Sequence, residues 1–146
     1  MNTGYIYSIS VSPSRGQLKK EVDEANLIDN LGIEGDGHAG DWGRQITCLN
    51  WSSVHKANEA YHISAGPGDF AENLLIDGID LSNAKVGSKI HISDSIILEV
   101  TQIGKEDHPS IVSRTFGVSL LPKEGLFCRV IYGGKVRKGD LVNITI

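Results

Sequence analysis

Short runs in which apolar and polar residues alternate recur along this chain and are separated by turns rich in glycine. The runs at 4–11, 87–92, 96–103, 125–132 and 139–144 have this pattern, which is typical of half-buried β-strands. Glycine makes up 17 of the 146 residues, well above the ~7% that is usual, and many turns imply many short elements. The sequence predicts a mostly β fold, a barrel or a sandwich, without the strand-and-helix rhythm of a parallel sheet.

One segment has the pattern of a helix. Apolar residues at 54, 57 and 61 share one helical face, and Ser52 or Ser53 is placed to cap a helix that runs to about Tyr61. Residues 18–28 are ambiguous, because their composition also suits a helix. We favour two short strands there, around Val22 and at 25–28, because the surrounding spacing is β-like.

Composition bounds the class of protein. Residues 1–146 form one domain of ordinary size, and a net charge of −4 argues against a nucleic-acid-binding surface. No apolar run approaches the ~18 residues of a membrane span, and no secretory signal is visible, so we expect a cytoplasmic protein without membrane contacts. Cys48 and Cys128 lie in separate apolar runs, which favours buried thiols in a reducing compartment.

A polar, glycine-rich stretch at 32–49 offers the first candidate site residues. Five glycines, three acids, a histidine and an arginine fall within its first thirteen residues, and a predicted strand follows. The stretch is either a surface turn with solvated charges or the polar mouth of a strand, where sites often lie. Asp36, His38 and Arg44 are the candidates. Glu72 and Asn73 similarly precede an apolar run, although Glu72 could be simply solvated.

A second polar loop follows the predicted strand at 96–103. Gln102 ends the strand, and Lys105, Asp107 and His108 follow in the loop. Arg129 lies between two large apolar residues, a setting that favours a strand-edge residue over an anion ligand.

Taken together, these segments resemble the MOSC domain, the family related to the C-terminal part of molybdenum cofactor sulfurases, in its compact, stand-alone bacterial form. The matching segments are GDGHAG at 35–40, Arg44-Gln45, GDFAENL at 68–74, GIDL at 78–81, Val86-Gly87, LEVTQIGK at 98–105, His108 and EGLFCRV at 124–130. The resemblance implies a closed or partly open β-barrel with one or two short helices. It also implies a link to the molybdenum cofactor (molybdopterin), with pyridoxal phosphate binding as a family-level association only.

The chain departs from this family at the residues that carry sulfur. MOSC domains typically have a cysteine just before the loop histidine, where this chain has Asp107, and a second cysteine is common near the segment that here reads Val118-Ser119-Leu120. Holding a persulfide requires a thiolate, which a carboxylate cannot replace. Cys128 does not take that position, and we expect it to be unreactive.

The first hypothesis is therefore a module that binds molybdenum cofactor, possible partners being a molybdoenzyme or a cofactor-biosynthesis protein. Cationic groups would bind an anionic pterin, and amide groups would contact its ring edge. The candidate cofactor-binding residues are Asp36, His38, Arg44, Glu72, Asn73, Gln102, Lys105 and Arg129, and no metal ligand is assigned.

Three alternatives remain open. The chain could be a sulfur transferase or an oxidoreductase linked to the cofactor, although the replaced cysteine counts against a sulfur carrier. It could be a metal-dependent hydrolase that uses Asp36, His38, Asp107 and His108. It could also be a diverged barrel without catalytic activity that acts as a scaffold.

Overall fold

Alternation of buried and exposed side chains along the strands builds a closed β-barrel. The computed structural model describes residues 3–146. Its strands are β1 (Thr3–Val11), β2 (Lys20–Val22), β3 (Glu24–Ile28), β4 (Gly32–Ile33), β5 (Ile46–Asn50), β6 (Leu74–Asp77), β7 (Lys89–Ile92), β8 (Ile96–Ile103), β9 (Leu126–Tyr132), β10 (Gly134–Arg137) and β11 (Leu141–Thr145). Its helices are α1 (Trp51–Tyr61), α2 (Ile111–Phe116) and α3 (Leu121–Glu124).

Seven strands close on one another. The order is β11, β7, β8, β9, β5, β6 and β1, and β1 pairs in turn with β11. β2 extends this sheet beyond β1, while β10, β3 and β4 form a small second sheet. Closure leaves no free edge among the seven strands, which is how a small β-protein avoids edge-to-edge association. The predicted fold class is confirmed.

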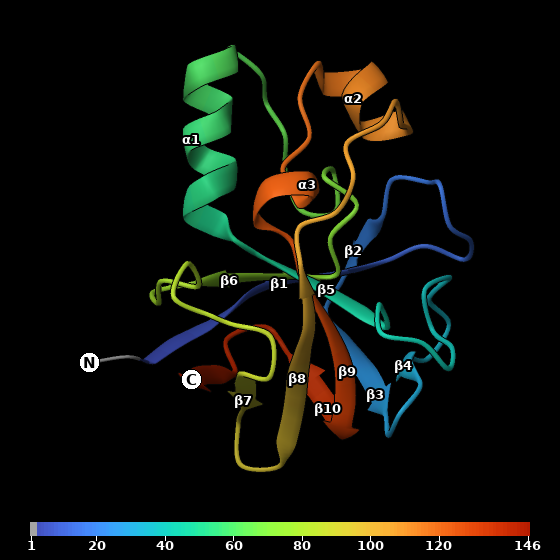
Figure 1. The fold of residues 1–146 in the computed structure, drawn as a ribbon, viewed down its shortest axis with the longest axis vertical. Coiled ribbons are helices and arrows are strands. Elements are labelled where there is room, and N and C mark those ends of the chain that lie inside the picture. The colour runs from blue at the N-terminus through green and yellow to red at the C-terminus, as the bar shows by residue number, and fades with distance from the viewer. Residues whose placement is uncertain (1–2) are drawn as a thin grey trace.

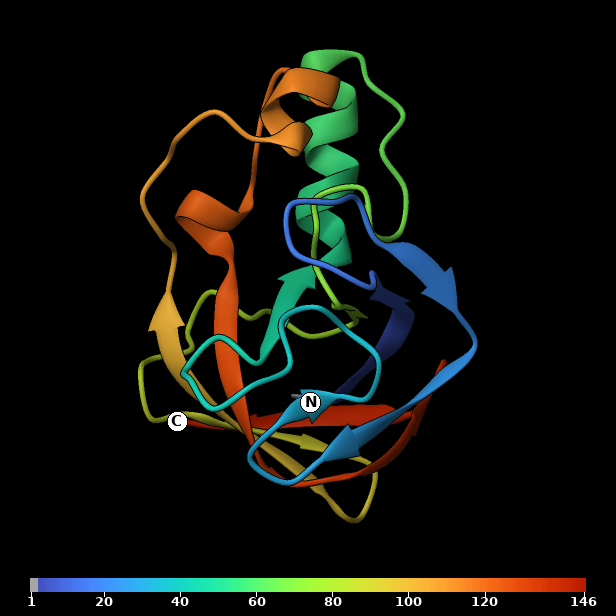
Figure 2. The ribbon, with the colours of Figure 1, turned by 90° about the vertical axis from the view of Figure 1, so that its right-hand side faces the viewer.

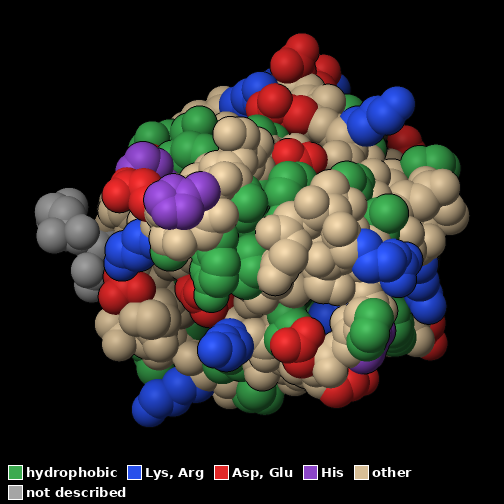
Figure 3. All heavy atoms as spheres, turned by 90° about the horizontal axis from the view of Figure 1, so that it is seen from above, with side chains coloured by type: hydrophobic (Ala, Val, Ile, Leu, Met, Phe, Trp, Pro, Cys, Tyr) green, Lys and Arg blue, Asp and Glu red, His purple; other side chains and the backbone are tan. Residues whose placement is uncertain are grey.

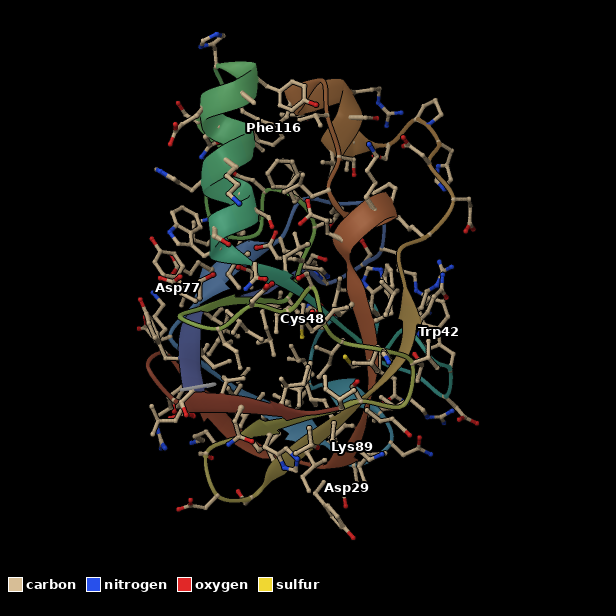
Figure 4. All side chains as sticks on the ribbon, turned by 60° about the vertical axis from the view of Figure 1, so that its left-hand side comes forward. Asp29, Trp42, Cys48, Asp77, Lys89 and Phe116 are labelled. Atoms are coloured by element: carbon tan, nitrogen blue, oxygen red, sulfur yellow. The ribbon has the colours of Figure 1, made fainter. Side chains whose placement is uncertain are left out.

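Branched aliphatic side chains fill the barrel. In β9, Leu126, Cys128 and Val130 point into this core, whereas Phe127 belongs to a second apolar cluster outside the barrel wall, as the pleat predicts. Cys48 lies in the middle of the barrel (Figure 4). Both cysteines are buried and unpaired, in agreement with the sequence analysis.

The three helices gather at one end of the barrel (Figure 1). Val54 and Ala57 of α1 pack with Phe70 and Phe127 in the second cluster, which fixes the helices on the barrel. Viewed from above, hydrophobic side chains reach the surface in the middle of this end, with charges of both signs around them (Figure 3). None of the helices in residues 3–146 has the length and apolar character needed to cross a membrane.

The structure corrects two details of the sequence analysis. The N-cap of α1 is Asn50, not Ser52 or Ser53, and its amide makes no cap bond because it binds backbone atoms of Ile76, Ile79 and Leu81. In addition, β5 and β6 pair in parallel, with α1 between them along the chain, although the sequence showed no such unit.

The two short strands expected within residues 18–28 are confirmed as β2 and β3. Four further elements were not predicted, namely β4, β10, α2 and α3. A capping box formed by Ser110 and Ser113 begins α2, and Gly117 ends it in the left-handed conformation.

Candidate functional site

Loops from four parts of the chain surround a hollow of about 370 Å³ beside the helical end of the barrel. Figure 2 looks onto this side, with the loops at 12–19 (blue), 34–45 (cyan) and 104–110 (orange) around it. We call this hollow the loop pocket. Its lining residues are Gly16, Gln17, His38, Trp42, Arg44, Thr47, Phe70, Ala71, Lys105, His108, Pro109, Ser110, Ile111, Val112, Arg114, Ser119, Leu121 and Phe127.

The charges that line the loop pocket are of one sign. Arg44, Lys105 and Arg114 line it, together with two histidines and three hydroxyl-bearing residues. Among residues 3–146, no aspartate or glutamate is part of the lining. A concave, partly apolar surface with several cations and no carboxylate favours an anionic ligand.

Arg44 is held in place from three sides. Its Nε donates to Gln102 Oε1 at 3.1 Å, and its guanidinium carbon lies 5.1 Å from the centre of the Phe127 ring. Its Nη2 lies 3.6 Å from Glu106, whose side chain is largely exposed at the pocket rim. The side chain of Gln102 is fixed in turn by its own bond to the carbonyl of Gly104. Gln102 therefore orients Arg44 and is not itself a lining residue.

Lys105 is the second cation of the pocket. Burial and the neighbouring Arg44 guanidinium lower the pKa of Lys105, with Glu106 and Asp107 opposing part of that effect. Its ammonium has no hydrogen-bond or ion-pair partner among the residues that the structure describes. An anion bound between Arg44 and Lys105 would relieve their mutual repulsion.

Asp36 lies beneath the pocket and is already neutralised. Its Oδ1 accepts from Lys19 Nζ at 2.8 Å and from the Ser12 amide at 3.0 Å, and its Oδ2 accepts from the His38 amide at 3.0 Å. Burial alone would raise the pKa of Asp36, but these hydrogen bonds, that of Lys19 foremost, outweigh burial and hold the pKa below its usual value. The side chains of Asp36 and Lys19 are both fully buried, so Asp36 cannot contact a ligand in the pocket.

His38 connects this buried pair to the pocket. Its Nδ1 lies 3.2 Å from Lys19 Nζ, and its ring stacks with Trp42 at 6.2 Å between centroids and 10° between planes. Burial and the charge of Lys19 lower the pKa of His38 to about 4, so the imidazole is neutral at neutral pH. Trp42 donates from Nε1 to the carbonyl of His38 and carries Arg15 over its ring at 4.0 Å.

Glu72 and Asn73 have structural roles instead of lining the pocket. Both are fully buried. Glu72 accepts from the amides of Gly68 and Phe70, at 2.7 and 3.2 Å, and so holds the turn that precedes β6. Asn73 accepts from the Thr47 amide and donates to the Ser10 carbonyl, which joins β5 to β1.

Arg129 also lies away from the loop pocket. It donates to the side chain of Asn30 and forms an ion pair with Asp41 at 3.2 Å, both outside the pocket lining. The strand-edge interpretation is wrong, because Arg129 lies in the middle of β9, which pairs with β8 on one side and β5 on the other. Of the eight predicted cofactor-binding residues, the structure places His38, Arg44 and Lys105 in the pocket lining.

Asp107 and His108 face different hollows. His108 lines the loop pocket, whereas Asp107 lines a separate hollow between the helices. With Asp36 paired to Lys19, the four residues of the metal-hydrolase hypothesis do not come together. No group of three or more His, Cys, Asp or Glu side chains suited to a metal ion occurs among residues 3–146.

The two cysteines lie inside the barrel and do not line the loop pocket. Cys128 contacts Cys48 inside the barrel, and this contact together with burial raises the pKa of the Cys128 thiol well above its usual value. A buried thiol of raised pKa is not a nucleophile. No cysteine lines the loop pocket among the described residues.

The sequence analysis missed Lys19, Trp42 and Arg114. Lys19 is adjacent to the exposed Lys20 in a polar segment, and nothing in the spacing tells the two apart. Trp42 carried a usable signal, since a large aromatic residue within a glycine-rich polar loop is unusual in a merely solvated turn.

A comparison with known protein families gives one match. The model of the MOSC domain matches residues 34–105, from the glycine-rich loop to Lys105. Residues 34–105 belong to the MOSC domain family. The segment matched includes three of the loop-pocket cations and histidines, His38, Arg44 and Lys105. A comparison with curated proteins found no match.

Solved structures share the fold of this MOSC protein. The YuaD protein from Bacillus subtilis superimposes with a TM-score of 0.76 at 19% identity, covering 97% of this chain and 95% of that chain. YiiM from Geobacillus stearothermophilus gives 0.74 at 18% identity, covering 98% and 75%. YiiM from Escherichia coli gives 0.68 at 21% identity, covering 97% and 70%. At these identities the likeness establishes the fold alone.

Proposed function

We propose that this MOSC protein binds the molybdenum cofactor, or a closely related pterin phosphate, in the loop pocket. The observation that carries the proposal is the positive charge of the pocket lining, which includes Arg44, Lys105 and Arg114. The nearby carboxylates are either neutralised beneath the pocket, as Asp36 is by Lys19, or lie outside the lining. Phosphate groups are recognised by such clusters of cations. The family supplies the choice of cofactor, since MOSC domains are associated with molybdenum cofactor.

The residues present fit the organic part of this cofactor. A volume of about 370 Å³ lies within the usual range for small-ligand pockets. Arg44, Lys105 and Arg114 would hold the phosphate, and Trp42 and Phe127 supply aromatic surface for a heterocycle. When bound, the cofactor supplies redox and sulfur chemistry through its metal and dithiolene.

The same lining offers nothing for sulfur transfer by the protein itself. A sulfur carrier needs an accessible thiolate, and both thiols are enclosed in the barrel. We therefore propose a binding or delivery role in the cytoplasm, with a molybdoenzyme or a cofactor-biosynthesis protein as the partner that receives the cofactor.

Native mass spectrometry of the purified protein with added molybdopterin tests the proposal. We expect a one-to-one complex for the wild type and loss of at least tenfold in affinity for Arg44→Ala, because a charge-assisted bond contributes about 1.5–3 kcal/mol. Arg129→Ala is the matched control, since it removes the same charge outside the pocket. Equal binding by Arg44→Ala and Arg129→Ala would show that the loop pocket is not the binding site for the cofactor.

A further inference from the structure

A buried lysine contacts one of the two ring nitrogens of His38. Lys19 Nζ lies 3.2 Å from His38 Nδ1, 2.8 Å from Asp36 Oδ1 and 3.2 Å from Ser12 Oγ. Its side chain is fully buried, as is that of Asp36. An ammonium group has only protons to donate, so the imidazole nitrogen that faces it must be the one without a proton.

We propose that Lys19 is a positioning residue: its ammonium fixes His38 as the tautomer with the proton on Nε2, which gives the loop pocket a neutral hydrogen-bond donor for an oxygen atom of the ligand. His38 is a pocket-lining residue, and Nε2 has no partner among the described residues. The proposal rests on the proposed function only in taking this pocket as the ligand's place.

The charges around the imidazole of His38 favour its neutral form. Lys19, Arg15 and Lys105 all disfavour a charged imidazolium, and only Asp36 opposes them, at 3.8 Å from Nδ1. Lys19 and two backbone amides already neutralise Asp36, so its carboxylate stabilises a charged imidazole ring only weakly. Stacking on Trp42 then holds the ring plane, so that Nε2 has a fixed direction.

The backbone is built to keep Lys19 in this position. The Lys19 amide donates to the Gly68 carbonyl, and a Cβ atom added at Gly68 would come within 2.2 Å of the Lys19 carbonyl oxygen. On the other side, the Gly37 amide donates to the Ser12 carbonyl. Two glycines thus let three separate loops approach closely enough to bury one ammonium beneath the pocket.

This arrangement restricts the chemistry of the pocket. Nε2–H can donate to a phosphate oxygen or to a ring carbonyl, but it has no lone pair with which to accept a proton. His38 therefore selects ligands that present a hydrogen-bond acceptor, and it does not serve as a general base through that atom.

Nitrogen-15 NMR of the ligand-free protein tests the tautomer directly. We expect the His38 signals at pH 7 to show a proton on Nε2 and a bare Nδ1. A His38 with its proton on Nδ1, or a charged His38 at pH 7, would overturn the proposal. Because no ligand is added, this result is independent of whether the pocket binds a pterin.

A variant separates positioning from packing. Lys19→Met keeps an unbranched side chain, one atom shorter, and removes the ammonium, and we expect both His38 tautomers to be populated. Lys19→Met combined with Asp36→Asn avoids a lone buried carboxylate and should give the same mixture if the single variant fails to fold. A His38 that stays wholly on Nε2 in a folded variant would contradict the role of Lys19.

Inorganic phosphate then reports on the donor itself. Added to the wild type, it should shift the Nε2 signal of His38 and leave that of His55 unchanged. Phosphate that binds without moving the His38 signal would show that Nε2–H is not used, and would leave the proposed anion pocket itself intact.

Discussion

The guanidinium of Arg44 lies 3.6 Å from the carboxylate of Glu106, whose side chain is 72% exposed at the rim of the loop pocket. Glu106 is therefore the counter-charge of a cation whose other contacts are an amide and an aromatic ring. A ligand anion must compete with this rim carboxylate for Arg44. The negative charge of Glu106 at the rim therefore lowers the affinity of the pocket for anions.

Glu106→Gln should strengthen anion binding. Removing the competing charge frees Arg44, and exposed pairs of this kind are weak, so we expect a gain of roughly two- to fivefold at low salt that shrinks as salt increases. Calorimetric titration with inorganic phosphate measures it. Glu99→Gln is the matched control, because Glu99 pairs with Lys89 away from the pocket. The same gain in both variants would indicate a general effect of net charge instead.

Glu72 should make stability depend on pH. Burial raises its pKa from 4.5 to about 7, against the opposing bonds from Gly68 and Phe70. The folded state thus keeps a proton that the unfolded chain has already lost, so this contribution falls as pH rises from 4.5 to about 7. The loss amounts to about 3 kcal/mol.

Urea unfolding of the wild type and of Glu72→Gln at pH 5 and pH 8 measures this loss as a difference between the two proteins. The comparison cancels His38, whose lowered pKa acts in the opposite sense and adds stability as pH rises from about 4 to 6.5. An identical pH dependence for the two proteins would show that Glu72 is ionised throughout.

Gly68→Ala should destabilise the protein by more than about 2 kcal/mol, since the backbone is left-handed there and the added Cβ would also overlap the Lys19 carbonyl. Gly16→Ala is a close control, because Gly16 has φ of +78° against +82° for Gly68 but has no atom within 4 Å of the added Cβ. We expect about 1 kcal/mol for Gly16→Ala by thermal unfolding. Equal losses would mean that the contact with Lys19 costs nothing.

Asn73→Asp should destabilise by about 2–3 kcal/mol, because the new carboxylate would face the Ser10 carbonyl and leave that acceptor unpaired in the core. Asn143→Asp on the exposed face of β11 should change stability little. Chemical denaturation of both variants provides the comparison. A small loss for Asn73→Asp would show that water reaches this site.

The fold was largely predictable because its strands alternate in the sequence. Residues 96–103 show the period of two, and β8 has the corresponding burial pattern. The parallel pairing of β5 and β6 was not predictable, since it depends on the long connection through α1 at the end of the barrel and not on any local pattern. The short α2 and α3 lack the length over which a helical period is visible.

The candidate site was only partly predictable. His38, Arg44 and Lys105 stand beside glycines at the ends of strands and do line the pocket. Glu72 and Asn73 have the same polar, strand-end setting, but they turn inward to satisfy backbone groups, and a sequence does not show in which direction a side chain turns. Lys19 is remote from its partners along the chain, so only the fold brings it beneath His38.

The most direct test of the account is the affinity of molybdopterin for wild-type protein, Arg44→Ala and Arg129→Ala, measured side by side in reducing buffer. We expect one equivalent to be bound by the wild type and by Arg129→Ala, and affinity at least tenfold weaker for Arg44→Ala. A wild type that binds no pterin, or an Arg44→Ala variant that binds as tightly as the wild type, would contradict it.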